Sequence, residues 1–150
     1  MPGADTPVFS IVVESYRELA DLAAEHNVTI VVENHGWIEA DPKIIPLLIN
    51  ALDGRIAASP DLANWTPEVR YEGLKRCFPH AVTCDFRTRG LTAAWEHRAY
   101  DLRRCFDIGW QAGFRGPWCL ENMNSEAAAN FRQLRWLKSQ LEAWIREAGA

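Results

Sequence analysis

The sequence predicts an α/β fold made of parallel βα units, and three observations lead to this prediction. Short segments rich in β-branched residues begin near residues 28, 55, 81 and 117, a spacing of 26 to 36 residues. Segments with a helical spacing of apolar residues lie between them. Strands at this spacing in one sheet are parallel and are joined by right-handed crossovers. We therefore expect four parallel strands, each followed by a helix.

The first half of the chain contains two of these units. Apolar residues recur at helical spacing over residues 14–26, and the β-branched run at 28–33 is short enough to be a buried strand. A second helix is expected over 41–52, where Asp-Pro supplies an N-cap and a first-turn proline. Pro46 is expected to delay or bend the start of this helix. The second strand is expected at 55–59.

The second half of the chain repeats this order. A helix over 66–79 opens with a Thr-Pro-Glu cap and closes at a proline, and a third strand follows at 81–86. Apolar residues on one face predict a helix over 102–113. A Gly-Pro turn then leads into a fourth strand at 118–121, and the last helix is expected over 131–144.

Length and composition are those of a soluble globular chain that forms one domain over residues 1–150. Hydrophobic residues make up 48% and charged residues 24%, and the net charge is −4. The mild acidity argues against a nucleic-acid-binding module, and no apolar run approaches the roughly 18 residues that span a membrane. The N-terminus lacks the basic region of a signal peptide. Together with four cysteines without a C-x-x-C pair, these features predict a cytoplasmic protein with free thiols.

The carboxyl ends of the predicted strands carry the residues best suited to chemistry. In parallel α/β proteins, functional groups gather at these ends and in the loops that follow. The candidates are Glu33, Asn34 and His35 after the first strand, Asp61 and Asn64 after the second, Thr83, Asp85 and Arg87 at the third, and Glu121 and Asn122 at the fourth. Oxygen ligands of this kind favour Mn²⁺ or Mg²⁺, and a histidine would admit Zn²⁺ or Co²⁺.

Each acidic candidate also has a purely structural interpretation. Glu33 can cap the loop that follows it, Asp61 lies in a Pro-Asp turn of the kind common on surfaces, and Glu121 can pair with an arginine. A single histidine such as His35 is more often a hydrogen-bonded structural residue than a ligand. The joint occurrence at equivalent ends of consecutive strands favours a shared site.

Aromatic and basic residues near the strand ends leave two alternatives open. Trp37 and Trp65 directly follow strand ends, so they could wall a bound sugar or pack in the interior. Arg87 and Arg89 follow the third strand, where they could contact a substrate phosphate or lie solvated in a loop.

Three stretches of the sequence resemble the sugar phosphate isomerase/epimerase family, whose members have a xylose isomerase-like barrel. They are Val32-Glu33-Asn34-His35-Gly36, Ser59-Pro60-Asp61-Leu62-Ala63-Asn64-Trp65, and the segment from Tyr100-Asp101 through Ala112-Gly113-Phe114-Arg115-Gly116 to Leu120-Glu121. The family's usual forms are an E-N-H-G stretch, a P-D-x-G-N-F-like stretch and a D-Y…A-G-Y-x-G…I-E ending. The resemblance covers about residues 14 to 122.

The resemblance implies a (β/α)8 TIM barrel that holds a divalent metal through two glutamates, an aspartate and usually a histidine. By position, Glu33, Asp61 and Glu121 match three of these ligands. It further implies that the two glutamates exchange the proton on the carbon next to a sugar carbonyl, with an enediolate as the intermediate. The implied substrate is a small sugar or sugar phosphate, which points to a role in carbohydrate metabolism.

Two departures from the family pattern bear on these expectations. Thr83 stands where the family commonly has a metal-binding histidine, and Asp85, on the same strand face, is the candidate substitute ligand. A full barrel needs about 250 residues, whereas the four predicted strands match only the fifth to eighth. We therefore expect a partial barrel, the C-terminal half, with the N-terminal half missing.

Three functions remain in competition. The first is a metal-dependent isomerase or epimerase, with Glu33 and Glu121 as the catalytic pair. The second is a truncated, non-catalytic barrel half that binds a sugar or a partner chain, including a homodimer that would cover two raw sheet edges. The third is an AP-endonuclease-like DNA repair enzyme, which the acidic charge and the single well-placed histidine, His35, argue against.

Overall fold

The computed structural model describes residues 7–36 and 40–149. Within these ranges, helices and strands alternate along the chain. The helices are α1 (Pro7–Glu25), α2 (Ile44–Ala51), α3 (Arg70–Cys77), a short 3-10 helix η2 (Phe78–His80), α4 (Leu102–Gln111) and α5 (Ala127–Gly149). The strands are β1 (Val31–Val32), β2 (Ala57–Ala58), β3 (Cys84–Thr88) and β4 (Trp118–Asn122). None of the helices in this part of the chain is long and apolar enough to cross a membrane.

The pairings between the four described strands are parallel, as predicted. β1 pairs with β2, and β3 pairs with β4. Two parallel bridges, Ala58 with Ala81 and Asp61 with Asp85, connect these two small sheets. The spatial order is therefore β1-β2-β3-β4, and the α/β class is confirmed. The four strands do not close into a barrel.

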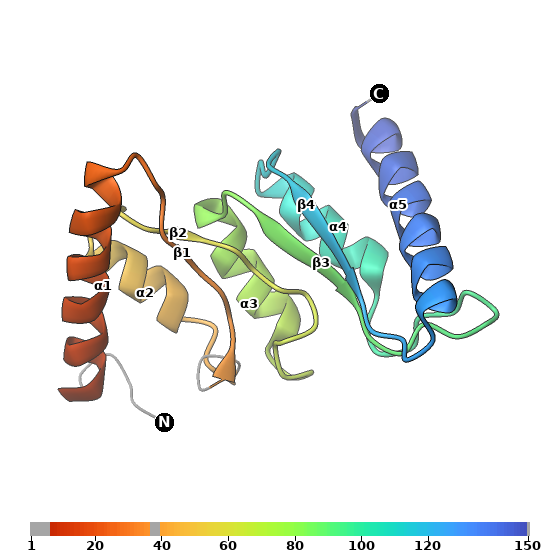
Figure 1. Cartoon of the computed structure of the whole chain (residues 1–150), viewed down its shortest axis with the longest axis horizontal. Helices are drawn as coiled ribbons and strands as arrows, with labels where there is room; N and C mark the ends of the chain where they lie inside the picture. Colours follow the sequence, from red (N-terminus) through yellow and green to blue (C-terminus); the bar gives the residue numbers. More distant parts are fainter. Residues whose placement is uncertain (1–6, 37–39, 150) are drawn as a thin grey trace.

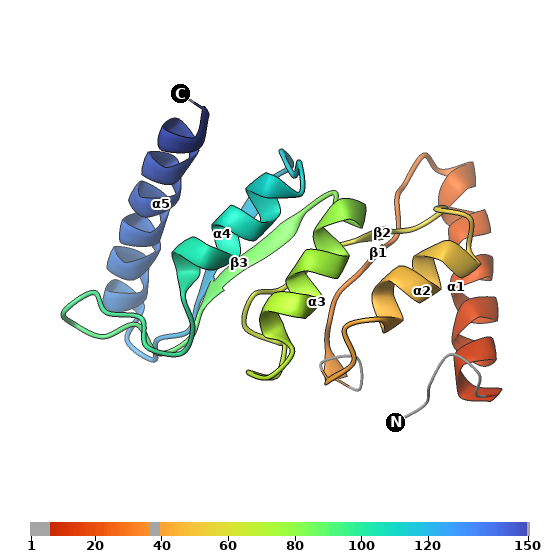
Figure 2. The same cartoon turned by 180° about the vertical axis from the view of Figure 1, so that it is seen from behind.

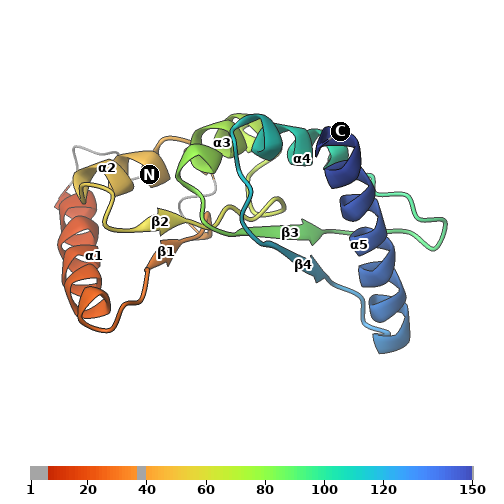
Figure 3. The same ribbon diagram turned by 90° about the horizontal axis from the view of Figure 1, so that it is seen from above.

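The helices cover one face of the strands (Figures 1 and 2). Viewed from above, α2, α3 and α4 lie on the same side of β1 to β4, while α1 and α5 stand at the two ends of the row (Figure 3). Among the described residues, no helix covers the opposite face of the sheet. The sheet therefore has one face buried in the core and one face open.

Aromatic packing between β4 and the helices builds much of the core. The Trp118 ring lies 4.9 Å from the Phe114 ring and 5.4 Å from the Phe106 ring, centroid to centroid. Gly109 permits this approach of α4, because a Cβ there would lie 2.7 Å from ring atoms of Phe78 and Trp118. Three of the four cysteines are also buried, and all four thiols are free, as predicted.

Several element boundaries differ from the sequence-based expectations. α1 begins at Pro7, seven residues before the predicted start, and α3 begins at Arg70 rather than near residue 66. Pro46 lies in the first turn of α2, so the helix start is delayed as expected. β3 runs to Thr88 because its ladder with β4 extends through the Thr88–Asn122 pair. Arg87, predicted to lie in a loop, is therefore part of the strand.

Candidate functional site

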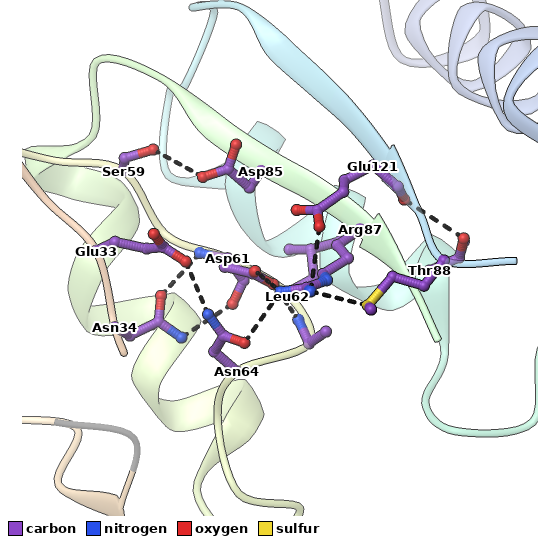
Figure 4. A network of polar contacts seen from close by, with 12 residues as sticks. Glu33, Asn34, Ser59, Asp61, Leu62, Asn64, Asp85, Arg87, Thr88 and Glu121 are labelled. Carbon is purple, nitrogen blue, oxygen red and sulfur yellow. Dashed lines mark hydrogen bonds and ion pairs between the residues drawn. The ribbon is translucent and has the colours of Figure 1, made fainter. Parts of the chain in front are cut away.

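Four successive strands bring four carboxylates to one edge of the sheet (Figure 4). Glu33 directly follows β1, Asp61 lies just beyond β2, Asp85 belongs to β3 and Glu121 to β4. The order of the strands in space is their order in sequence, so the carboxyl ends lie side by side. Glu33, Asp61 and Glu121 lie at or just beyond these ends, whereas Asp85 is the second residue of β3 and lies near its amino end.

Strand alternation sets the direction of the β3 side chains. Cys84, Phe86 and Thr88 are buried toward the helices, whereas Asp85 and Arg87 between them are only partly buried. Arg87 pairs in register with Glu121 of β4, so both side chains lie on the open face of the sheet. This alternation places a cation among the acidic side chains.

Arg87 is the centre of the polar network. Its guanidinium lies 2.9 Å from Oδ2 of Asp61 and 3.1 Å from Oε1 of Glu121. It also donates to Oδ1 of Asn64 over 3.3 Å. The Arg87 side chain is 16% exposed and that of Asp61 is 1% exposed, so this ion pair is shielded from solvent. The pair with Glu121 is weaker, because the Glu121 side chain is 45% exposed.

Asn34 holds Asp61 in place from the neighbouring strand. The Asn34 amide donates to the Asp61 carbonyl over 3.0 Å, and the Asp61 N–H donates to Oδ1 of Asn34 over 2.7 Å. The Asp61 carboxylate also accepts from the Ala63 N–H over 2.6 Å. Because Asn34 and Asp61 are fully buried, these bonds form in a low dielectric and fix the loop after β2.

The pKa of the Glu33 carboxyl lies above its ordinary value. Burial raises the pKa of its carboxyl, and the negative charges of Asp61 and Asp85 raise it further, while His35 and Arg87 oppose the shift. Its Oε1 accepts a hydrogen bond of 2.7 Å from the Asn64 amide, which orients the carboxyl group. A carboxyl with a raised pKa is a stronger base than an ordinary glutamate.

Asp85 lies on the same open face and belongs to the same electrostatic group. Burial raises the pKa of its carboxyl, against a hydrogen bond of 3.3 Å from the Ser59 hydroxyl, and the charge of Asp61 adds to the increase. Its bonding partner is therefore a serine rather than Arg87, which holds the carboxylates of Asp61 and Glu121.

The other predicted site residues lie in different environments. His35 is exposed beside Glu33. Trp65 is 1% exposed, and its ring packs so tightly on Gly73 of α3 that a Cβ there would lie 2.6 Å from it. Its ring is therefore core rather than an open wall for a sugar. Trp37 lies outside the described residues. The interpretation of Asp61 as a surface turn residue is wrong, because its side chain is buried.

Sequence reasoning placed Asn34 among the strand-end candidates without a specific role, and it did not single out Ser59 or Arg70. Asn34 and Ser59 hold Asp61 and Asp85, and Arg70 is buried with its guanidinium bonded to the Leu62 carbonyl. Ser59 lies two residues before Asp61, so strand alternation was the available signal. For Arg70 no pattern existed, because a basic residue at a helix start normally lies in solvent.

The divalent metal that the family resemblance implies does not match this arrangement of side chains. The carboxylate donors are those that Mn²⁺ or Mg²⁺ prefers. However, the guanidinium of Arg87 already pairs with Asp61 and Glu121, and Glu33 is bonded to Asn64. In the part of the chain that the structure describes, no three His, Cys, Asp or Glu side chains lie close enough together to hold a metal ion. As arranged here, the residues do not fit a divalent ion.

Comparison with known proteins adds no assignment. No protein-family model matches the chain, and no curated protein matches its sequence.

Proposed function

We propose that this chain carries the carboxylate edge of a sugar or sugar phosphate isomerase or epimerase. The observation that carries the proposal is Arg87, which holds the carboxylates of Asp61 and Glu121 from two different strands, with Glu33 joined to the same network through Asn64. Such an edge, at the carboxyl ends of parallel strands, is where α/β enzymes bind and convert small polar ligands.

We further propose that the four βα units are part of a (β/α)8 wall, equivalent to its fifth to eighth units. Three features support this: consecutive strand order, purely parallel pairing, and helices on one face only. In a closed barrel the open face would line the interior, with the carboxylates at its mouth.

In the proposed reaction, Glu33 is the base. Its carboxylate takes the proton from the carbon next to the sugar carbonyl, the C–H electron pair forms a C=C bond, and the carbonyl π pair moves onto oxygen. The resulting enediolate is stabilised by the guanidinium of Arg87 and the amide of Asn64. For isomerisation, Glu33 returns the proton to the neighbouring carbon while the proton of the adjacent hydroxyl moves to the former carbonyl oxygen, so that the carbonyl group shifts by one carbon. For epimerisation, a protonated Glu121 gives its own proton to the same carbon from the opposite side, the carbonyl forms again, and exchange with water then removes the proton from Glu33 and restores the one on Glu121.

The proposed proton transfer uses side chains and no metal ion, because Arg87 already balances the negative charges of Asp61 and Glu121. A divalent ion, Mn²⁺ or Mg²⁺ before Zn²⁺ or Co²⁺, would have to compete with this guanidinium for Asp61 and Glu121. The two cations therefore exclude each other at this edge, which a titration can test.

Hydrogen–deuterium exchange tests the proposed reaction. Pentoses, hexoses and their phosphates are incubated with the protein in D₂O, and NMR follows deuterium at the carbon next to the carbonyl. We expect exchange with at least one sugar and a loss of about 100-fold or more in Glu33→Gln. Glu72→Gln, at an exposed ion pair on α3, is the matched control and should keep full activity. Absence of exchange with every sugar, or an unchanged Glu33→Gln, would refute the proposal.

A second candidate function is a non-catalytic barrel half that pairs with a second copy of the chain. Among the described residues, β1 and β4 each have a strand partner on one side only. Exposed apolar side chains occur on the elements at this end of the row: Ile11 and Leu22 on α1, and Val31 on β1. Unpaired edges with apolar neighbours are normally covered in stable proteins.

Opposite charges on the two end helices favour a second copy as the cover. α1 is acidic, with Glu14, Glu18, Asp21 and Glu25 against Arg17, whereas α5 is basic, with Arg132, Arg135, Lys138 and Arg146 against Glu142 and Glu147. α1 stands at the β1 end of the row and α5 at the β4 end (Figure 1). Pairing the β4 edge of one copy with the β1 edge of another therefore brings a basic helix to an acidic one.

A further inference from the structure

One histidine closes the base of the loop that joins β3 to α4. The loop leaves β3 after Thr88 and returns to α4 at Leu102. The half-buried ring of His97 bonds both of its sides. Its Nε2 accepts from the Arg89 N–H over 3.0 Å, and its Nδ1 donates to the Tyr100 carbonyl over 2.9 Å. The imidazole therefore ties the start of the loop to its end, and we call His97 with these two bonds the histidine clasp.

The two bonds of the clasp fix the protonation state of the ring. The Tyr100 carbonyl can only accept, so Nδ1 carries a proton. The Arg89 N–H can only donate, so Nε2 keeps a free lone pair. Only the neutral imidazole with its proton on Nδ1 meets both demands. A second proton, on Nε2, would set two donors against each other and break the bond to Arg89.

The surroundings of His97 also favour the neutral ring. Burial lowers the pKa of His97, and the charge of Arg70 at the start of α3 adds to the decrease, while the bond to the Tyr100 carbonyl opposes it. The Tyr100 ring lies 4.4 Å from the imidazole, and burial raises the pKa of its hydroxyl. Arg89 meets the ring from the end of β3. On the loop itself, the exposed neighbours Glu96 and Arg98 bond to each other over 3.0 Å. Among these groups, His97 is the one that titrates between about pH 5 and pH 7.

The loop end that the clasp holds also holds Arg87. The Tyr100 hydroxyl donates to the Arg87 carbonyl, and the Arg70 guanidinium lies 4.3 Å above the Tyr100 ring. His97 fixes Arg89, two residues after Arg87, and it fixes the backbone of Tyr100. The carboxyl end of β3 is thus tied to the returning chain at two places, one on each side of Thr88.

The far end of the loop has its own anchors on α5, which do not involve the histidine. Gln133 donates to the Leu91 carbonyl over 2.9 Å, and the Trp95 ring stacks on the Trp136 ring at 5.9 Å. These contacts contain no group that titrates near neutral pH. Charging His97 therefore frees the base of the loop and leaves its tip in place.

We propose that neutral His97 is a positioning residue for Arg87, and that protonation of its Nε2 opens the clasp. The inference goes beyond the proposed reaction and does not depend on it. It makes the position of the central cation of the network, and with it the pairs to Asp61 and Glu121, depend on pH. The clasp is closed at neutral pH and opens as pH falls through the range in which His97 gains its proton.

NMR of the ¹⁵N-labelled protein tests the clasp directly. We expect His97 to carry its proton on Nδ1 at about pH 7.5 and to titrate below the ordinary value of about 6.5. As the ring charges, the protection of the Arg89 amide against hydrogen exchange, corrected for the intrinsic rate, should fall at least about tenfold. The Nε signal of Arg87 should shift over the same pH range. The Thr92 amide, which donates to the Glu96 carbonyl over 2.9 Å at the tip, should change by less than about twofold.

Substitutions at His97 separate a pH-dependent clasp from a structural contact. His97→Gln supplies one donor and one acceptor that do not titrate, so Arg89 should keep its protection within about twofold at both ends of the pH range. His97→Phe keeps a ring against Tyr100 but loses both bonds, so protection should be low throughout. His26→Gln, at an exposed histidine after α1, is the matched control and should behave as the wild-type chain does.

Three results would overturn the inference. One is a proton on Nε2 of His97 at neutral pH. Another is a loss of Arg89 protection in His97→Gln equal to that of the wild-type chain. The third is a loss of protection at Thr92 together with Arg89, which would mean that the whole loop unfolds. If His97→Gln does not fold, the wild-type titration decides, because Arg89 protection must then follow the charge of His97 at every pH.

Discussion

The guanidinium of Arg87 donates to the buried carboxylate of Asp61 over 2.9 Å, linking β3 to the loop after β2. The backbones of Asp61 and Asp85 form a parallel β-bridge at the same place. The junction of the two small sheets is thus held by an ion pair as well as by the ladder. Arg87 is also the only basic residue of β3, so it supplies the positive charge that this strand brings to the acidic side chains.

Removing this cation should be costly. Arg87→Met leaves the buried Asp61 carboxylate without a counter-charge, and we expect a loss of about 3–5 kcal/mol in the free energy of unfolding. Arg87→Lys keeps the charge without the planar fork and should lose less. Urea denaturation measures both. Arg17→Met breaks an exposed pair on α1 and should cost less than about 1 kcal/mol. Equal costs for Arg87→Met and Arg17→Met would mean that the Asp61 pair is unimportant.

The competition between Arg87 and a divalent ion is a second prediction. Arg87→Met frees the oxygens of Asp61 and Glu121 and removes a positive charge, so Mn²⁺ should bind this variant at least about tenfold more tightly than the wild-type chain. Calorimetric titration of the folded variant, checked by circular dichroism, measures the affinity. Tight Mn²⁺ binding by the wild-type chain that Arg87→Met leaves unchanged would contradict the exclusion of the two cations.

Glu33 should make stability depend on pH. Burial, and then Asp61 and Asp85, raise its pKa in the folded chain. The folded state therefore keeps this proton to a higher pH than the unfolded state does, so stability falls as pH rises from the unfolded value of about 4.3 through the folded one. Glu33→Gln removes this loss and can still accept from Asn64.

The variant should therefore be more stable than the wild-type chain above neutral pH, and the difference should shrink toward about pH 4. Urea midpoints at both pH values measure it, with Glu72→Gln as the exposed control. A constant difference between Glu33→Gln and the wild-type chain across this range would show that burial does not affect this carboxyl.

Charge reversal tests the proposed pairing of two copies. Glu18→Lys with Glu25→Lys makes α1 basic, and Arg135→Glu with Arg146→Glu makes α5 acidic; all four side chains are exposed. Each variant alone brings like charges together and should be monomeric in analytical ultracentrifugation. A mixture of the two restores opposite charges at both junctions and should form a heterodimer. Monomeric wild-type protein, or a mixture that does not associate, would exclude this mode of pairing.

The sequence by itself determined the α/β class, the parallel strands and the residues at their carboxyl ends. Spacing and β-branched runs are local signals, and a parallel sheet brings equivalent strand ends together whatever the details. For this reason the order of residues along the chain is enough to predict that Glu33, Asp61 and Glu121 lie at neighbouring strand ends, whereas the position of Asp85 near the amino end of β3 depends on where that strand begins.

Only the tertiary structure determined which of these residues pair with one another and which are buried. β3 extends to Thr88 because β4 pairs with it, and this ladder turns Arg87 from a loop residue into the partner of Asp61 and Glu121. The burial of Trp65 likewise depends on Gly73 of α3, which no local pattern reveals. Pair distances and burial arise from contacts between segments far apart in sequence, so the cation at the acidic edge appears only when the chain is folded.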